Sequence, residues 1–375
     1  AGAERAAVHR SVAGPVGVSM KIGDRHIGPD HPPYIIAEIG VNHDGRLDTA
    51  LRLVDAAAAA GADAVKLQVF RAGQLLHASS TLADYQKSSD AASPMQLLAG
   101  LELTDVELVR VVTAIEEAGL IPLATPFSPA DVDRIAALGL PAVKLASPDL
   151  VNPLLLDVVA QLGLPMLLST GTATLAEVSW ATTRLHANDA SFALLQCVSS
   201  YPTADGDAQL GAMRSLNSFG TCVGYSDHTQ NLRTGALAVA AGASIIEKHL
   251  THDRNASGPD HAASADPQQF ANYVRQLRNC ERMLGKPFKH MLSCEEDVRN
   301  VSRQSLVTAR PLRAGQTIAL DDLTCMRPGI GIPAMRIDDV VGLATKRDLA
   351  AGEMLVFSDL IEPALTLPTE TRRAA

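Results

Sequence analysis

Short apolar runs and helix-like segments alternate eight times between residues 34 and 284, and this alternation restricts the fold more than any other feature. The runs are rich in Val, Ile, Leu and Ala, which is typical of strands that are buried on both faces. Several of the segments between them begin after Asp, Ser or Thr and end at Gly, the usual start and stop signals of helices. Such alternation requires parallel strands, and eight units favour a closed (β/α)8 TIM barrel over an open sheet.

Almost every apolar run ends in a polar residue that could take part in chemistry. The carboxyl ends of all eight strands of a TIM barrel surround one mouth, so these side chains should converge on one pocket although they are far apart in the sequence. This convergence indicates an enzyme. The residues are Glu38, Lys66, Gln68, Thr125, Lys144, Ser147, Ser169, Ser199, Tyr201, Ser226, His228 and His249.

His228 and His249 follow the seventh and eighth runs, which are neighbours in a closed barrel. Two imidazoles, completed by water and substrate oxygens, suit a divalent ion such as Mn²⁺, Co²⁺, Zn²⁺ or Fe²⁺ and leave positions open for a carbonyl. The alternative is that each imidazole is only a hydrogen-bonding group.

Lys66 and Lys144 are predicted at buried strand ends, where an ammonium without a partner is unfavourable. A phosphate or carboxylate of a ligand would stabilise both, and the surrounding hydroxyls with Gly171 at the start of a helix would complete an anion site. Two alternatives remain open. Either lysine could form a structural ion pair with Glu38, Asp149 or Glu247, or Lys144 could form a Schiff base.

Three carboxylates, Glu38, Asp149 and Asp260, are candidates to orient a water or accept a proton, with structural ion pairing as the alternative. The string Gly-Pro-Asp-His occurs twice, at residues 28–31 and 258–261. The first copy precedes the first strand, so we expect a plain turn at the closed end of the barrel. Only the second copy follows the carboxyl end of a strand.

The long connection from residue 70 to residue 103 is predicted to be a lid or an acceptor-binding insertion, or otherwise an ordinary surface loop. Beyond the barrel, residues 310–323 and 347–360 are near-duplicates. Each copy predicts a strand, a Gly turn, a second strand and a short turn at Asp-Leu, so the pair should form a small pseudo-symmetric β domain. The expected divisions are an extension (1–20), the barrel (21–287), a linker (288–302), the β-rich domain (303–363) and a tail (364–375).

The chain has 375 residues, a formal net charge of −9 and only 3% aromatic residues. The acidic balance argues against nucleic acid or an anionic membrane as the main partner, although a local pocket can still bind a small anion. The five cysteines show no CxxC spacing, which predicts a reducing compartment without disulfides. No signal peptide or membrane span is expected, and these features together predict a cytoplasmic protein.

An ordered set of motifs resembles the sialic acid (N-acetylneuraminate) synthase family, which carries a C-terminal SAF (antifreeze-like) domain. The SAF resemblance lies in Met326-Arg327-Pro328-Gly329. The barrel motifs are Ala37-Glu38-Ile39-Gly40-Val41-Asn42-His43, Val65-Lys66-Leu67-Gln68, Thr125-Pro126-Phe127, Leu168-Ser169-Thr170-Gly171, Tyr201-Pro202-Thr203, Ser226-Asp227-His228-Thr229, Glu247-Lys248-His249 and Gly258-Pro259-Asp260-His261.

The resemblance implies condensation of phosphoenolpyruvate with open-chain N-acetylmannosamine or a related N-acyl hexosamine, giving a nine-carbon 2-keto acid and phosphate. It implies that His228 and His249 hold Mn²⁺, with Mg²⁺ or Co²⁺ possible, and that Glu38 positions the attacking water. The phosphoenolpyruvate carboxylate would bind Lys66 and Thr125. The remaining implied contacts are Lys144, Ser147, Ser169, Ser199 and Ser226 for the phosphate, and Gln68, Tyr201 and Asp260 for the sugar.

The resemblance also implies a domain-swapped homodimer in which Arg327 reaches the pocket of the partner subunit. Departures from the family concern the acceptor: Pro148-Asp149 stands where Gly-Glu is common, a basic residue is missing near residues 79–86, and Ala262 replaces a common Lys. A legionaminic or pseudaminic acid synthase, acting on a 2,4-diacetamido-trideoxyhexose, is therefore the alternative within the family. The further alternatives are a non-catalytic polysaccharide-biosynthesis or binding protein and a metal-dependent aldolase or 3-deoxy-heptulosonate synthase.

Overall fold

The computed structural model describes residues 18–77, 80 and 93–361. By its internal contacts the chain divides into two compact units, Ala1–Gly285 and Lys286–Ala375. Three predictions fall wholly or mostly outside these residues. They concern the N-terminal extension (1–20), the tail (364–375) and the basic residue missing near residues 79–86.

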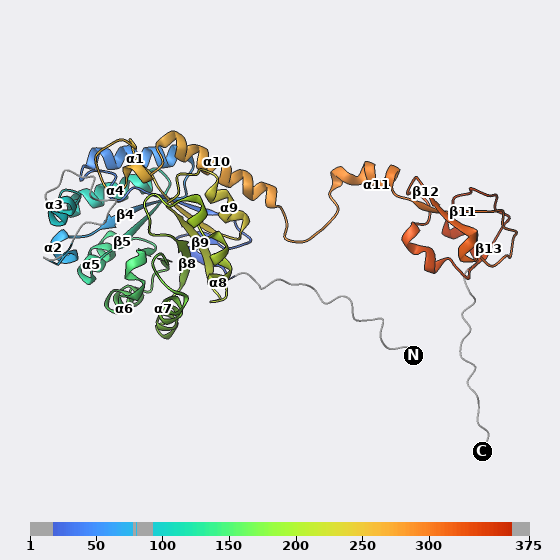
Figure 1. Cartoon of the computed structure of the whole chain (residues 1–375), viewed down its shortest axis with the longest axis horizontal. Coiled ribbons are helices and arrows are strands. Elements are labelled where there is room, and N and C mark those ends of the chain that lie inside the picture. The colour runs from blue at the N-terminus through green and yellow to red at the C-terminus, as the bar shows by residue number, and fades with distance from the viewer. Residues whose placement is uncertain (1–17, 78–79, 81–92, 362–375) are drawn as a thin grey trace, which may run out of the picture. The chain divides into compact units, whose positions relative to one another are not determined.

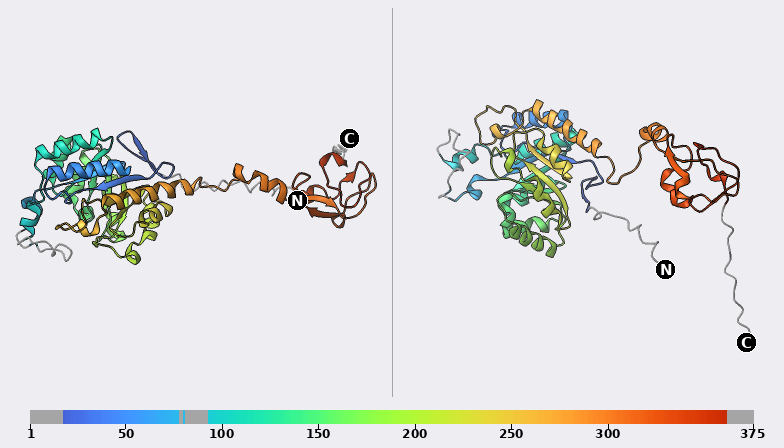
Figure 2. Two further views of the ribbon diagram at one scale, coloured as in Figure 1. Left: turned by 90° about the horizontal axis from the view of Figure 1, so that it is seen from above. Right: turned by 45° about the vertical axis from the view of Figure 1, so that its right-hand side comes forward.

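Eight parallel strands of the first unit close into a barrel in the order β10-β3-β4-β5-β6-β7-β8-β9. Helices surround this barrel in both views of the unit (Figures 1 and 2). The predicted (β/α)8 TIM barrel is therefore confirmed. The strands are β3 (Tyr34–Glu38), β4 (Ala64–Val69), β5 (Ile121–Pro126), β6 (Val143–Leu145), β7 (Met166–Ser169), β8 (Phe192–Cys197), β9 (Cys222–Asp227) and β10 (Ile245–His249).

The helices begin at the caps that the sequence indicates. Thr104, Thr174 and Asp266 each form a capping box with the Glu or Gln three residues later, which satisfies backbone N–H groups of the first turn. The helices of this unit are α1 (Leu47–Ala60), α2 (Ala72–Leu75), α3 (Pro94–Ala99), α4 (Asp105–Glu117), α5 (Pro129–Leu138), α6 (Pro153–Gln161), α7 (Leu175–Ala187), α8 (Met213–Asn217), α9 (Thr234–Ala240) and α10 (Pro267–Leu284).

Residues 206–219 have the pattern of one continuous helix, but the helix that forms there is much shorter. Two 3₁₀ turns, Asp205–Asp207 and Leu210–Ala212, precede the five-residue helix α8. Gly206 and Gly211 lie in these turns, and glycine lowers the stability of a continuous α-helix relative to alanine.

Two apolar cores lie on opposite sides of the barrel wall because side chains alternate along a strand. Ile35, Val65 and Ile246 belong to the larger core between strands and helices, whereas Ile36 and Ile245 belong to a smaller core inside the barrel. The inner core also contains Met20, Ile22 and Ile27 from the hairpin of β1 (Met20–Ile22) and β2 (Arg25–Ile27). The hairpin therefore closes the amino-terminal end of the barrel.

The second unit is built from two similar halves, as its near-duplicate sequence predicts. The strands expected on either side of each Gly turn are, however, only isolated bridges, at Leu312 and Thr317 in the first copy and at Leu349 and Met354 in the second. Leu312 and Leu349, which are equivalent positions, exchange both backbone hydrogen bonds. Arg310 pairs with Asp322 in the first half, and Arg347 pairs with Asp359 in the second. The elements are α11 (Glu296–Ser302), β11 (Ser305–Thr308), β12 (Leu323–Met326), β13 (Ala344–Thr345) and β14 (Leu360–Ile361).

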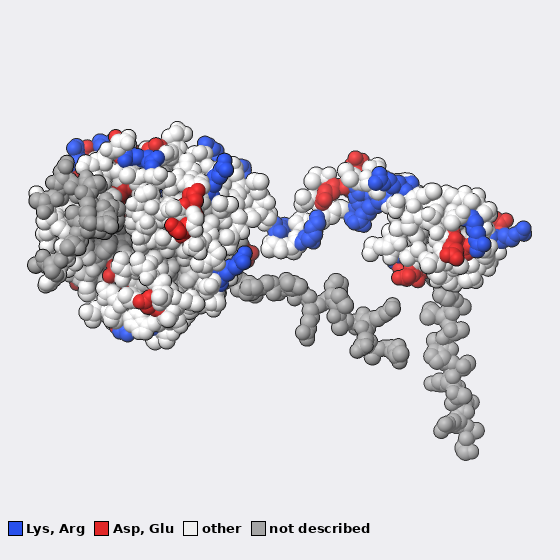
Figure 3. Space-filling model, in the orientation of Figure 1, with Lys and Arg blue, Asp and Glu red and all other residues white. Residues whose placement is uncertain are grey.

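Within the described residues no helix combines the length and the apolar character that crossing a membrane requires. On the face of the barrel unit in Figure 3, acidic and basic side chains are interspersed among uncharged ones.

Candidate active site

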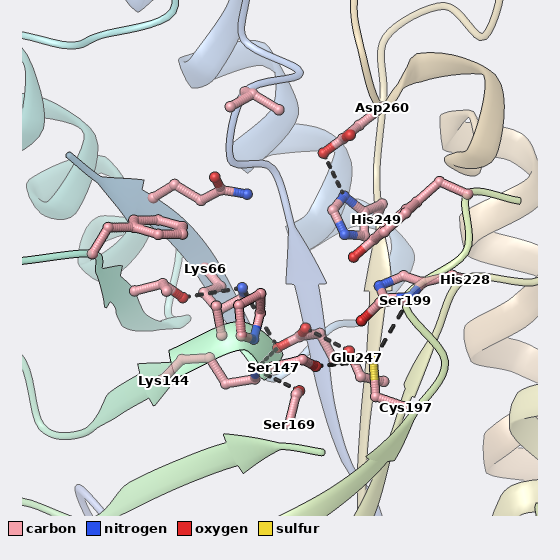
Figure 4. Close-up of a pocket in the computed structure, with 18 of the residues that line it drawn as sticks. Lys66, Lys144, Ser147, Ser169, Cys197, Ser199, His228, Glu247, His249 and Asp260 are labelled. Carbon is pink, nitrogen blue, oxygen red and sulfur yellow. Dashed lines mark hydrogen bonds and ion pairs between the residues drawn. The ribbon is translucent and has the colours of Figure 1, made fainter. Parts of the chain in front are cut away.

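A pocket of about 290 Å³ opens at the carboxyl ends of the barrel strands. Figure 4 shows polar side chains from several strands directed into it. The structure brings most of the predicted site residues to this pocket. Those that line it are Lys66, Gln68, Thr125, Lys144, Ser147, Ser169, Ser199, Tyr201, Ser226, His228, His249 and Asp260.

A two-residue step along each strand explains why these particular side chains meet. In β10, Ile245 belongs to the core inside the barrel, while Glu247 and His249, two and four residues later, line the pocket. Ile246 lies instead in the core on the outer side of the wall. The alternation that fills the barrel with apolar groups thus turns the polar strand ends into its mouth.

The two lysines lie in unequal electrostatic surroundings. Lys66 Nζ is 2.5 Å from Glu38 Oε2 and 3.7 Å from Glu247 Oε2, and it donates to Thr125 Oγ1 at 3.2 Å. Lys144 Nζ lies 3.9 Å from Glu247 Oε2, and it donates to Ser169 Oγ at 2.6 Å. Burial acts to lower the pKa of both; the carboxylates outweigh burial for Lys66, whose pKa is raised, but not for Lys144, whose pKa is lowered.

Glu247 is a site residue that the sequence analysis considered only as an ion-pair partner. It is 3% exposed, its Oε1 accepts from Ser226 Oγ at 2.8 Å, and its buried Oε2 accepts no hydrogen bond. Burial acts to raise its pKa, but the ammonium groups of Lys144 and Lys66 prevail and lower it to about 2. Glu247 therefore carries a negative charge between two positive charges. Its position two residues before His249 was the signal that could have identified it.

A cluster of donor groups gathers at the ends of β6, β7 and β8. The Gly171 backbone N–H donates to Ser147 Oγ at 3.0 Å. A Cβ atom at position 171 would collide with Ser199 Oγ and lie 2.9 Å from Ser147 Oγ, so only glycine lets the two hydroxyls approach the backbone this closely. Lys144 and Ser169 lie beside Ser147 in Figure 4, and Lys144 Nζ donates to Ser169 Oγ. Hydroxyls and an ammonium are donors that a phosphate group accepts.

The imidazoles of His228 and His249 lie side by side, with ring centroids 5.4 Å apart. His228 Nδ1 donates to the Val198 carbonyl at 2.8 Å, because a carbonyl oxygen can only accept, and this leaves the Nε2 lone pair for a ligand. His249 Nδ1 is buried without a hydrogen bond. Burial, reinforced by His228 and Lys66, holds the pKa of His249 well below its usual value, so the ring is neutral.

Burial acts to lower the pKa of His228, but Cys197 and the Val198 carbonyl prevail and raise it. The two rings fit a divalent ion when His228 has lost its Nε2 proton, since a deprotonated imidazole nitrogen is a metal ligand. Among the described residues, no group of three or more His, Cys, Asp and Glu side chains is arranged to hold one ion. An ion at the pair would therefore need water or substrate oxygens as further ligands. Such open positions distinguish catalytic metal sites from structural ones.

Asp260 enters the pocket from the loop that follows β10. Its Oδ2 lies 3.6 Å from His249 Nδ1, and burial, with a smaller contribution from Glu38, raises its pKa to about 7. Glu38 lies behind the pocket wall, fully buried, where it pairs with Lys66 and accepts from Gln68 Nε2 at 3.3 Å.

Asp149 does not reach the pocket. Ser147 lines the pocket, and a continued strand would turn Asp149 the same way, but the chain becomes a 3₁₀ helix over Ser147–Val151. With three residues per turn, a residue two positions later points to another side. The Asp149 carboxylate instead accepts from Asn152 Nδ2 at 3.2 Å, and burial raises its pKa.

Arg327 belongs to the second unit, where it is exposed directly after β12. Its role at a partner's pocket stays a prediction.

The first copy of Gly-Pro-Asp-His is a turn, as expected, in which the His31 N–H donates to the Gly28 carbonyl at 3.1 Å. Of the long connection after β4, Leu98 on α3 lines the pocket.

Comparisons with known proteins agree with this geometry. A model of the NeuB family matches residues 53–289, and a model of the SAF domain matches residues 303–361. The chain is 36% identical to N,N'-diacetyllegionaminic acid synthase of Legionella pneumophila over 92% of this chain and 99% of that protein. It is 31% identical to N-acetylneuraminate-9-phosphate synthase of Mus musculus over 88% of this chain and 92% of that protein.

The structure is also similar to a solved one. The crystal structure of N-acetylneuraminic acid synthetase from Leptospira borgpetersenii, in complex with citrate, superposes with a TM-score of 0.69 and 33% sequence identity. The match covers 75% of this chain and 95% of that one.

Proposed function

This chain belongs to the NeuB family of enzymes, and we propose that it condenses phosphoenolpyruvate with the open-chain aldehyde of an N-acyl amino sugar to give a nonulosonic acid and phosphate. One observation carries the proposal: the donor cluster around Lys144 and the pair of imidazoles line a single pocket. An anionic enol ester and a carbonyl can therefore be held together there.

In this proposal the phosphoenolpyruvate carboxylate binds Lys66 and Thr125, and its phosphate binds Lys144 with the hydroxyls of Ser147, Ser169, Ser199 and Ser226. The weak charge compensation of Lys144 supports this division, since its ammonium lies 3.9 Å from the carboxylate of Glu247, its ion-pair partner. Bound phosphate would supply the charge that Lys144 lacks. Glu247 keeps both ammonium groups charged before the ligand arrives.

His228 and His249 would hold a divalent ion, most consistently Mn²⁺, with Mg²⁺ or Co²⁺ as alternatives. When bound, the ion would polarise the aldehyde oxygen and so make the carbonyl carbon more electrophilic. The enol carbon of phosphoenolpyruvate then forms the new bond. Water adds to C2, and phosphate leaves from the tetrahedral intermediate. Glu38, which lies behind the pocket wall, would orient this water through Lys66 and Gln68, its two partners at the pocket. Asp260, with Gln68 and Tyr201, holds the sugar, and the raised pKa of Asp260 suits it to exchange a proton with the aldehyde oxygen.

The acceptor is either N-acetylmannosamine or a 2,4-diacetamido-trideoxyhexose. The second candidate is favoured by the apolar side chains at the pocket, Val41, Leu98, Phe127 and Pro148, which suit a methyl group better than a hydroxymethyl group. The Legionella relative named as a diacetyllegionaminic acid synthase supports the same choice.

The direct test is phosphate release from phosphoenolpyruvate with a panel of amino sugars, with and without EDTA. We expect release only with an N-acylated acceptor and only with a divalent ion present. No release with any acceptor would contradict the synthase, and activity that survives chelation would remove the role given to the two histidines.

A domain-swapped homodimer with Arg327 at the partner's pocket is part of the proposal, and mixed subunits test it. Lys144→Met and Arg327→Ala are expected to be nearly inactive alone. A refolded mixture should regain activity, because the pocket of the Arg327→Ala subunit would receive an arginine from the Lys144→Met subunit. A monomer in light scattering, or no recovery of activity on mixing, would contradict the domain swap.

The cytoplasmic location of the protein stays a prediction.

A further inference from the structure

A buried polar cluster lies behind the two histidines, on the outer side of the barrel wall, and the proposed mechanism does not use it. Its centre is the ion pair of Asp227 on β9 and Lys248 on β10, with Lys248 Nζ 3.1 Å from Asp227 Oδ2. Tyr273 of α10 donates to the same carboxylate oxygen at 2.7 Å. Asp227 is 1%, Lys248 2% and Tyr273 0% exposed, and none of the three lines the pocket.

The sequence places this pair directly next to the imidazoles. Asp227 immediately precedes His228, and Lys248 immediately precedes His249. Asp227 and Lys248 also form the last paired position between β9 and β10. The imidazoles therefore project from residues beyond the last paired position, where strand pairing no longer fixes the distance between β9 and β10.

Lys248 fixes the backbone on both sides of His228. Besides its contact with Asp227, its Nζ donates to the Thr229 carbonyl at 2.7 Å. Asp227 Oδ1 accepts from the backbone N–H of Thr229 at 2.9 Å and from its Oγ1 at 2.8 Å. One ammonium, carried by the neighbour of His249, thus fixes the residues before and after His228.

Stability alone does not account for a buried ion pair at this place. Withdrawing two charges from water is unfavourable, and well-packed apolar residues of similar volume often stabilise a protein equally well. The directional contacts of the pair, rather than its energy, are its distinctive property.

We propose that Asp227 and Lys248 are positioning residues, which hold the two imidazoles at the separation that a divalent ion requires. The inference rests on the proposed function, in which His228 and His249 bind that ion. It assigns the pair no contact with substrate, and it predicts that geometry rather than charge connects the pair to ion binding.

The test compares Asp227→Asn with Lys248→Met by titrating the metal-free full-length protein with Mn²⁺ and following free ion by electron paramagnetic resonance. Positioning predicts that both variants bind Mn²⁺ ten- to a hundredfold more weakly. A purely electrostatic influence predicts opposite signs, because one substitution removes a negative charge and the other a positive charge. Tighter binding by Lys248→Met, or unchanged binding by both, would overturn the proposal.

A matched control separates positioning from loss of stability. Asp63 is a largely buried carboxylate, 8% exposed in its side chain, that is paired with Arg25 and Arg278 at the opposite end of the barrel. Asp63→Asn should lower the melting temperature yet leave the Mn²⁺ affinity unchanged. Equal weakening of Mn²⁺ binding by Asp63→Asn would reduce the pair to a general structural role. Should Asp227→Asn not fold, Tyr273→Phe removes one hydrogen bond from the same carboxylate, and we expect a smaller loss of Mn²⁺ affinity; an unchanged affinity counts against the proposal.

A second readout keeps this inference distinct from the proposed function. If the unmodified protein binds no Mn²⁺, the metal role itself fails. The imidazole resonances of ¹⁵N-histidine-labelled, metal-free protein then decide about the pair. Those of His228 and His249 should shift in Asp227→Asn and Lys248→Met but not in Asp63→Asn; unchanged resonances would show that the pair does not position the rings.

Discussion

The two ends of the barrel interior are equally buried but chemically opposite. Ile36 and Ile245 are 0% exposed in the inner apolar core, and Glu38 and Glu247, two residues further along the same strands, are 0% and 3% exposed. Burial therefore does not distinguish the structural end from the reactive end. The difference is that Glu38 and Glu247 have the ammonium of Lys66 beside them, which offsets part of the cost of keeping carboxylates away from water.

The repeated tetrapeptide shows the same contrast with identical residues. At the amino-terminal end, Asp30 and His31 are exposed. At the carboxyl end, Asp260 is 8% exposed and faces His249, while the fully buried His261 contacts Asp44 Oδ1 at 2.8 Å. A short motif thus acquires a role from the end of the strand it follows, as barrel architecture requires.

The largest effect is expected from removing a charge at the carboxyl end. Lys144→Met should lower kcat/KM for phosphoenolpyruvate by about a thousandfold, since a preorganised contact of this type contributes about 3–4 kcal/mol. The melting temperature should hardly fall. Lys21→Met, in the hairpin at the other end, is the control and should keep full activity. A Lys144→Met protein with normal turnover would end the contrast between the two ends.

The complementary change at the amino-terminal end should affect folding and leave catalysis unaltered. Asp63 accepts from Arg25 at 2.6 Å, from Arg278 at 2.7 Å and from the Ile35 N–H at 2.8 Å. Asp63→Asn should reduce the free energy of unfolding by about 1–2 kcal/mol, because two partly exposed guanidinium groups lose their carboxylate but keep contact with water. Urea denaturation measures this, and kcat of the folded fraction should match the unmodified protein.

Identical substitutions in the two tetrapeptides sharpen the comparison. Asp260→Asn should lower kcat by about a hundredfold, the loss typical of a proton-exchanging group. Asp30→Asn should change neither kcat nor stability measurably, because the side chain is exposed. Steady-state kinetics with saturating phosphoenolpyruvate distinguish the two, and equal activities would mean that the second copy is also only a turn.

The smallest effect concerns pH and a histidine just beyond β3. Burial lowers the pKa of His43 to about 4, despite opposing contributions from Asp44 and Glu107. The unfolded chain, with a pKa near 6.5, then binds more protons between these values, so stability falls as the pH falls below about 6.5. From pH 6.5 to 5.5 this histidine should remove about 1 kcal/mol from the free energy of unfolding. His43→Gln should show a correspondingly flatter pH dependence; an unchanged slope would contradict the buried neutral state.

The barrel and most of the pocket could be predicted because both depend on local patterns: apolar runs, helix caps and polar strand ends. Glu247 was recognised only as an ion-pair partner, although alternation with His249 already placed it inside the mouth. Asp149 could not be placed, since a 3₁₀ turn after β6 changes the direction of side chains without a distinct sequence signal. Cys197, whose Sγ lies 3.8 Å from His228 Nδ1, was likewise missed, because strand ends were searched for charges and hydroxyls.

The two-residue step along the strands also limits how such an enzyme can change over evolutionary time. Side chains alternate between the two faces of a strand, so deleting Ile246 would turn Glu247 and His249 to the opposite face of β10 relative to Ile245. Insertions after the strands leave that order intact. New sugar preferences can therefore arise through the length and composition of loops such as residues 70–103, while the enol phosphate chemistry is inherited unchanged.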